Sequence, residues 1–313
     1  MILSGGLTFS GGLTVTPQPP SYLAYAIFGY GYANPSRQSM TNLVSNTGVV
    51  AADTTGVGTA RSSLSAAGYG TDKALFGYGD TGPSSVSITN LVSNTGVVAN
   101  DTTGVGTARY SLAAATYGSD KAIFGYGYGT GYTAITNLVN NTGVVANDTA
   151  GVGTARVNLA AAGYGTDKAI FGYGQNSSGN PVSMTNLVSN TGVVATDTAG
   201  VGTSRSNLAA AGYGTDKSIF GYGLLPGGSS YSSVTNLVSN TGVVASDTTG
   251  VGTARFALSA ATYGTDKAIF GYGQSSGYES ITNLVSNTGV VSTNTTGVGT
   301  ARTSLAAATY GST

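Results

Sequence analysis

The chain of 313 residues contains no cysteine, no histidine and no tryptophan. Without cysteine it can form neither a disulfide nor a thiolate metal site. Without histidine a Ser-His-Asp nucleophile is excluded, and the common nitrogen ligands of transition metals are missing. We therefore expect a protein that is not an enzyme and that uses no metal and no cofactor.

Charged residues are also scarce. Twelve basic and twelve acidic side chains make up 8% of the chain and leave a net charge of zero, which argues against nucleic acid as a partner. No run of about 18 apolar residues could span a membrane, so we expect no membrane insertion. The segment Met1–Gly6 lacks the basic region of a secretory signal, so we expect no signal peptide.

What the sequence does contain is a repeat, rich in glycine and tyrosine, that is marked by six arginines: Arg61, Arg109, Arg156, Arg205, Arg255 and Arg302. The spacings between them are 48, 47, 49, 50 and 47 residues. All of this variation falls in one segment of each repeat. These variable windows are Tyr32–Met40, Asp80–Ile88, Tyr128–Ile135, Gln175–Met184, Leu224–Val234 and Gln274–Ile281. The remaining 39 residues, the constant frame, keep their number in each interval, which predicts one scaffold carrying one set of loops.

The two ends of the chain hold complementary parts of a repeat. The Ala-Ile-Phe-Gly-Tyr-Gly motif that should follow Gly311 is found instead at Ala26–Gly31. An open solenoid would need atypical capping repeats at its ends. We therefore predict a closed ring in which strands from both termini complete one unit.

Each repeat offers four short candidate strands, represented by Leu64–Tyr69, Lys73–Tyr78, Ile88–Ser93 and Val97–Asn100. Glycine and asparagine in the intervening segments favour tight turns. Alanine runs are only three residues long, which does not favour a helix. Four antiparallel strands repeated six times at a period near 48 predict an all-β fold, a six-bladed β-propeller of four-stranded blades.

The frame resembles kelch repeats. Arg109, the run Ala113–Ala115 and the motif Ala122–Gly127 match that family's pattern in order and spacing. Tyr126 splits the family's glycine pair, and the family's later Tyr and Trp are absent. The resemblance implies a ring over residues 22–313 whose first blade combines Tyr22–Asp53 with the inner strand Arg302–Tyr310. Kelch-like rings include a copper oxidase, but its Cys and His ligands are missing here.

Two sets of acidic residues recur with the repeat. Asp72, Asp120, Asp167, Asp216 and Asp266 each precede a lysine in a predicted hairpin turn. Asp53, Asp101, Asp148, Asp197 and Asp247 each lie eight residues before an arginine, and Asn294 takes this place in the last repeat. One interpretation is a structural Asx-turn or a pair between this residue and arginine. The alternative is that the six arginines form a ring on the axis and bind an anion there.

The variable windows hold the candidate recognition residues: Tyr32, Arg37, Asp80, Tyr128, Tyr132, Asn176, Asn180, Tyr231, Tyr278 and Glu279. Tyrosine among serine, glycine and asparagine is typical of recognition loops, because it offers rigid aromatic area beside adaptable hydrogen bonding. Drift in unconstrained loops would also vary their lengths. A host surface glycan or protein is the ligand we expect for these loops.

Residues 1–21 precede the ring. Ser4–Thr8 is repeated as Ser10–Thr14, and Leu7, Phe9, Leu13 and Val15 predict two short strands before a stiff linker at Pro17–Pro20. Such a segment can pair with a sheet edge of another chain, so we expect it to be an anchor to other structural proteins or to copies of itself.

The Gly-Gly-Leu-Thr runs of this anchor resemble N-terminal segments of some bacteriophage virion proteins. That resemblance implies a decoration or receptor-binding head on a virion. An extracellular lectin-like adhesin, or a filament subunit that inserts its N-terminal strand into a neighbour, is the alternative.

Overall fold

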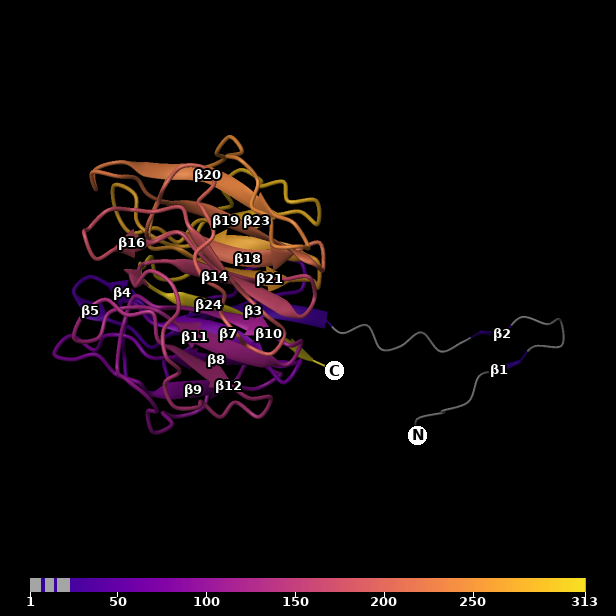
Figure 1. The fold of residues 1–313 in the computed structure, drawn as a ribbon. Coiled ribbons are helices and arrows are strands. Elements are labelled where there is room, and N and C mark those ends of the chain that lie inside the picture. The colour runs from indigo at the N-terminus through magenta and orange to yellow at the C-terminus, as the bar shows by residue number, and fades with distance from the viewer. Residues whose placement is uncertain (1–6, 9–13, 16–22, 313) are drawn as a thin grey trace.

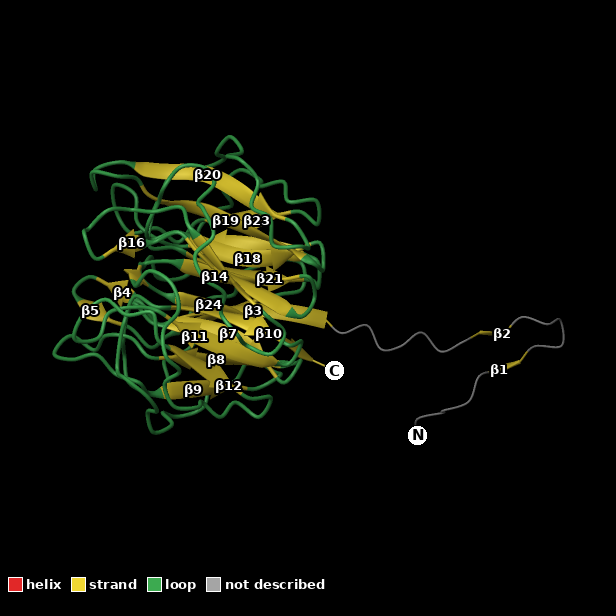
Figure 2. Ribbon diagram, viewed as in Figure 1, coloured by secondary structure: helices red, strands yellow, loops and turns green. Residues whose placement is uncertain are grey.

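The computed structural model describes residues 7–8, 14–15 and 23–312. In this part of the chain the regular elements are β-strands joined by turns and loops (Figures 1 and 2). No helix among the described residues is long and apolar enough to cross a membrane. The predicted all-β class is confirmed.

Six three-stranded antiparallel sheets form the bulk of the molecule. Their first strands are β7 (Ser65–Tyr69), β10 (Ala113–Tyr117), β14 (Ala160–Tyr164), β18 (Ala209–Tyr213), β21 (Ser259–Tyr263) and β24 (Ala306–Ser312). The middle strands are β8 (Lys73–Gly77), β11 (Lys121–Gly125), β15 (Lys168–Gly172), β19 (Lys217–Leu224), β22 (Lys267–Gly271) and β3 (Leu23–Gly29). The third strands are β9 (Thr89–Val92), β12 (Thr136–Val139), β17 (Thr185–Val188), β20 (Tyr231–Val238), β23 (Thr282–Val285) and β6 (Thr41–Val44).

Three further strand pairs are shorter. β1 (Leu7–Thr8) pairs with β2 (Thr14–Val15), β4 (Tyr32–Ala33) with β5 (Ser36–Arg37), and β13 (Arg156–Val157) with β16 (Gln175–Asn176). The first pair confirms two short strands in the N-terminal segment, and it brings Leu7 opposite Val15. The predicted strand residues Phe9 and Leu13 lie outside the described residues.

Strands from both ends of the chain share one sheet. β24 pairs with β3 along seven residues, from Ala306 opposite Gly29 to Ser312 opposite Leu23, and β3 pairs with β6. The other five sheets have the same register; in β7 and β8, for example, Ser65 lies opposite Gly77. The prediction that one unit draws strands from both termini is confirmed at this sheet.

The predicted fourth strand does not form, so the prediction of four-stranded units is wrong. The segment after β9 forms no continuous ladder with it: Val92 bridges Val98 and Thr89 bridges Thr102, with the amide of Ala99 donating to the carbonyl of Leu91 between them. It buries little apolar surface, because Val97 remains 65% exposed, Ala99 is exposed too, and Val98 alone packs partly buried against the core. Without burial, backbone pairing alone gives a short outer segment little stability.

The core lies between successive sheets. The six first strands contact one another in the order β7, β10, β14, β18, β21 and β24, and β24 also contacts β7. Their small side chains allow this close approach. Farther out, large side chains of neighbouring sheets interlock: the rings of Tyr78 and Phe124 lie 5.0 Å apart, and both are fully buried.

A cycle of backbone hydrogen bonds joins the segments that precede the six first strands. Its members are Ser63, Ser111, Asn158, Asn207, Ala257 and Ser304, all with φ between 51° and 54°. Each amide donates to the carbonyl of the member before it, over 2.8–2.9 Å, and Ser63 donates to Ser304 over 2.8 Å. We call these six equivalent bonds the hydrogen-bond cycle.

Candidate functional site

The six arginines are internal, and the interpretation that they form an anion-binding ring on the axis is wrong. Arg61, Arg109, Arg156, Arg205, Arg255 and Arg302 are each 0% exposed. Nε of Arg61 donates to the carbonyl of Tyr78 over 2.8 Å, and Nη2 donates to Oδ1 of Asn90 over 2.6 Å. Its guanidinium lies 4.3 Å from the centre of the Tyr30 ring, so the charge is held by oxygen acceptors and an aromatic face.

The second acidic set supports these arginines, as the structural interpretation predicted. Asp101 accepts hydrogen bonds from the amide and hydroxyl of Thr59 and from Nδ2 of Asn90, the last over 2.8 Å, and lies 3.8 Å from Nη1 of Arg61. The partner is thus the arginine of the preceding repeat. Burial acts to raise the pKa of Asp101, but the hydrogen bonds and the charge of Arg61 outweigh it and lower that pKa.

The first acidic set is confirmed as turn chemistry. Nζ of Lys73 lies 2.7 Å from Oδ1 of Asp72, and the other four pairs repeat this contact at 2.6–2.9 Å. The lysine side chains remain 41–44% exposed. The charged side chains that recur with the repeat therefore stabilise the constant frame. The arginines do so in its interior, and the Asp–Lys pairs do so in its turns.

The variable windows begin where the middle strands end. Strands β4, β5 and β16 belong to windows and lie on one side of the molecule, whereas the C-terminal end lies on the opposite side (Figure 1). We call the side that carries the windows the window face. It is the side on which the first strands begin, because Ser65 at the start of β7 lies opposite Gly77 at the end of β8.

Aromatic side chains of the windows contact their neighbours in pairs. Tyr32 and Tyr278, from windows at opposite ends of the sequence, lie 6.1 Å apart in a T-shaped arrangement. Tyr128 contacts Tyr132 and also Tyr110, each over 5.5 Å between ring centres. Such contacts leave the rings partly packed and fixed in orientation, which suits a preformed contact surface.

The remaining predicted window residues also have defined partners. Arg37 forms an ion pair with Asp80 of the next window. Asn176 and Asn180 bond to each other within one turn, and Glu279 accepts from the hydroxyl of Ser275. Tyr231 packs on Phe256, with ring centres 4.8 Å apart. The windows are thus ordered loops, tied within themselves and across neighbouring repeats.

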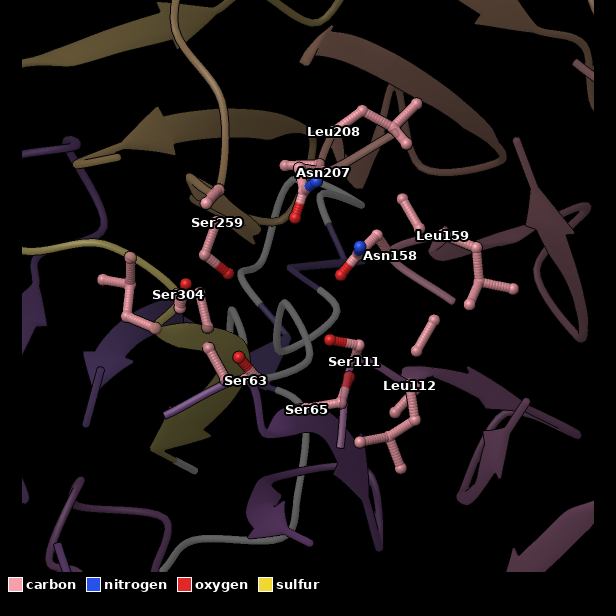
Figure 3. Close-up of a pocket in the computed structure, with 18 of the residues that line it drawn as sticks. Ser63, Ser65, Ser111, Leu112, Asn158, Leu159, Asn207, Leu208, Ser259 and Ser304 are labelled. Atoms are coloured by element: carbon pink, nitrogen blue, oxygen red, sulfur yellow. The ribbon is translucent and has the colours of Figure 1, made fainter. Parts of the chain in front are cut away.

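A pocket of about 110 Å³ lies within the hydrogen-bond cycle, where the first strands begin. We call it the axial pocket. Each repeat contributes four consecutive residues to its wall, such as Ser63–Ala66 and Asn158–Ala161. Figure 3 shows the polar ends of Ser111, Asn158, Asn207 and Ser259 turned toward its centre, while the leucine side chains point away.

Sequence reasoning missed this pocket. Most of its polar members stand two residues after an arginine, at a position where the frame changes between serine, asparagine and alanine. This variation in residue type, at a fixed distance from the arginine, was the sequence signal that could have indicated the pocket. This signal was not recognised because the position lies outside the variable windows. The neighbouring arginines, as charged residues, were the more obvious candidates for a site.

Comparison with protein-family models and with curated proteins returns no match. Among the residues that the structure describes, no group of three or more Asp and Glu side chains is placed to hold a metal ion. The window face and the axial pocket are the candidate functional sites of the described residues.

Proposed function

We propose that this chain is a non-enzymatic, kelch-like six-bladed β-propeller that presents its variable windows for recognition and docks through residues 1–21 to a larger assembly. The assembly we propose is a virion, on which the ring is a decoration or receptor-binding head. The recognition role rests on one observation: the repeats differ in length only in their variable windows, and these windows lie on one face of the molecule.

Two observations support the ring. The sheet that combines β24 with β3 and β6 has the register of the other five sheets. The hydrogen-bond cycle also links each repeat to the repeat before it and the repeat after it. The bond from the amide of Ser63 to the carbonyl of Ser304 links the first repeat to the last in the same way. In a closed ring each sheet packs between two neighbours, so no sheet is left with an uncovered face.

Recognition by the windows follows from the symmetry of the frame. Each frame feature occurs about six times, so a ligand without sixfold symmetry can be distinguished only by what differs between repeats. The windows differ most, and their tyrosines are held by neighbouring rings. Leu224–Val234 is the longest window, and Tyr231 within it is the residue we propose as its aromatic anchor.

The test uses particles purified from the source culture. Antibodies raised against residues 23–312 should label intact virions in immunogold electron microscopy. A chain that lacks residues 1–21 should fold but fail to join the particle. Particles without label, or normal incorporation of the shortened chain, would contradict the docking proposal.

A second arm tests recognition separately from docking. All other windows are replaced by the eight-residue sequence of Gln274–Ile281. Particles carrying this variant should assemble normally and lose attachment to host cells, and Tyr231→Ala alone should weaken attachment by roughly 1–3 kcal/mol if this ring is a hot spot. Undiminished attachment after the exchange of windows would refute recognition by the loops.

A further inference from the structure

The axial pocket has a wall chemistry of its own. Its lining consists of serine, leucine, alanine and asparagine. Backbone groups at its rim are already used, because the amides and carbonyls of Ser63, Asn158 and their equivalents bond to each other in the hydrogen-bond cycle. The polar groups left for a ligand are therefore side-chain hydroxyls and amides.

These side chains suit a ligand whose groups both donate and accept hydrogen bonds. A serine hydroxyl can do either, and the amides of Asn158 and Asn207 each offer two donors and an acceptor oxygen. Asn158 and Asn207 come from adjacent repeats, and Asn207 follows Asn158 in the hydrogen-bond cycle. They form one polar side of the pocket, while the corresponding place in the fifth repeat is Ala257, so the pocket is not sixfold in its chemistry.

The pocket also selects against charge. None of its lining residues is ionisable, and the nearby arginines are fully buried with partners of their own. A charged group brought into the pocket would lose water without gaining an opposite charge, and that transfer is costly. A neutral ligand with several hydroxyls avoids this cost, and the alanine methyl groups of the wall can contact its C–H groups.

The size of the pocket limits the ligand. A cavity needs at least about 10–15 Å³ to hold one water, so a pocket of about 110 Å³ has room for a small organic ligand. We propose that the axial pocket binds a neutral polyhydroxylated ligand of this size, a single sugar residue or a comparable polyol, with Asn158 and Asn207 as its main polar contacts. This site is separate from the windows, because its residues belong to the constant frame.

The chain itself suggests a conservative test variant. Serine occupies the Asn158 position in three other repeats, at Ser63, Ser111 and Ser304, with φ within a few degrees. The double change Asn158→Ser and Asn207→Ser should therefore keep the backbone while it removes both amides. The matched control is Asn140→Ser, because Asn140 lies in an exposed turn where other repeats have serine with the same local bonds, as in Ser93.

The experiment titrates the full chain with neutral hexoses, N-acetylhexosamines, deoxyhexoses and inositol, and with uronic acids as charged analogues, using saturation-transfer NMR and calorimetry. We expect a neutral member to bind, the double variant to bind it about tenfold more weakly because two hydrogen bonds are lost, and Asn140→Ser to bind it as the original chain does. Failure of every neutral sugar and polyol to bind, equal binding of the uronic acids, or unchanged binding by the double variant would overturn the proposal.

Two further arms separate the source of the ligand and the role of the windows. Binding to immobilised glycans that end in the bound sugar would identify the end of a glycan as the ligand. Binding to the free sugar alone would identify a free small polyol. Either result supports the proposal that the axial pocket is a binding site. The chain with exchanged windows should retain sugar binding, so failure of loop recognition and failure of the axial site are distinguishable. Loss of sugar binding in that folded variant would overturn the assignment of the site to the frame.

Discussion

Nη2 of Arg302 donates a 2.7 Å hydrogen bond to Oδ1 of Asn42, although 260 residues separate the two in sequence. Within one repeat the same bond joins Arg61 to Asn90 over 2.6 Å and 29 residues. The two termini therefore rebuild the contact that the chain makes locally elsewhere. A contact of such long range costs more loop entropy than its local equivalents, and the packing and the other bonds of the shared sheet must offset that cost.

The last repeat contains a weak point that a single substitution should correct. Nη2 of Arg255 and Oδ1 of Asn283 are buried without a hydrogen-bond partner among the described residues, and Asn294 stands where other repeats have aspartate. Asn294→Asp restores the carboxylate beside a buried guanidinium. We expect it to raise the free energy of unfolding by about 1 kcal/mol, measured by urea denaturation.

The reverse change in another repeat is the control. Asp247 accepts bonds from Thr203 and Asn236 and lies 3.7 Å from Nη1 of Arg205, so Asp247→Asn should lower the free energy of unfolding by a similar amount. Destabilisation by Asn294→Asp would contradict this explanation of the aspartate set.

Gly77 permits the close approach of two sheets. A Cβ atom at Gly77 would lie 2.7 Å from Cζ of Phe124 in the next sheet, a separation that forces side chains or backbone to shift. Gly77→Ala should lower the free energy of unfolding by about 1–3 kcal/mol. Gly131→Ala is the control, because that glycine has open space around it; equal stability of the two variants would show that the sheets do not pack as described.

Buried tyrosines predict an alkaline transition. Burial raises the pKa of Tyr30, Tyr78, Tyr126 and Tyr173 to about 12 from an ordinary value of 10.0. Because the folded-state pKa is the higher one, their contribution is complete below pH 10 and is lost as the pH rises from 10 to about 12. The loss reaches about 3 kcal/mol for each fully buried ring.

The pH prediction is checked by the free energy of unfolding across this range together with tyrosinate absorbance. We expect exposed rings to titrate first and the buried rings to titrate with unfolding. A single titration of all tyrosines near pH 10, with the fold retained, would contradict the burial of these rings.

Much of the fold could be predicted from the sequence because the repeat is regular. Split motifs at Ala26–Gly31 and at the C-terminal end predicted the shared sheet, since only pairing of β3 with β24 completes that unit. The strand ends were less predictable. Tyr78 was expected to continue its strand, but it adopts a φ of 63° and ends it; the ring and guanidinium contacts that favour this backbone come from distant residues.

The site was predictable only in part. Composition indicated the windows, but not that Arg37 would pair with Asp80 or Tyr32 with Tyr278, because those contacts cross between repeats. The arginines were misread in one interpretation because a sequence shows their charge but not their burial. The axial pocket is lined by six segments, one from each repeat, which no single repeat reveals.

The measurement that tests the closed ring most directly is a disulfide between the two ends of the chain. Ala24 and Gly311 lie opposite each other in β3 and β24, and the chain has no cysteine of its own. Paired positions in neighbouring strands fall within the reach of a disulfide. On oxidation, the variant Ala24→Cys with Gly311→Cys should form an intramolecular disulfide in the monomer and melt at a higher temperature than its reduced form. A free dithiol after oxidation, or disulfides only between separate chains, would contradict closure of the ring through its termini.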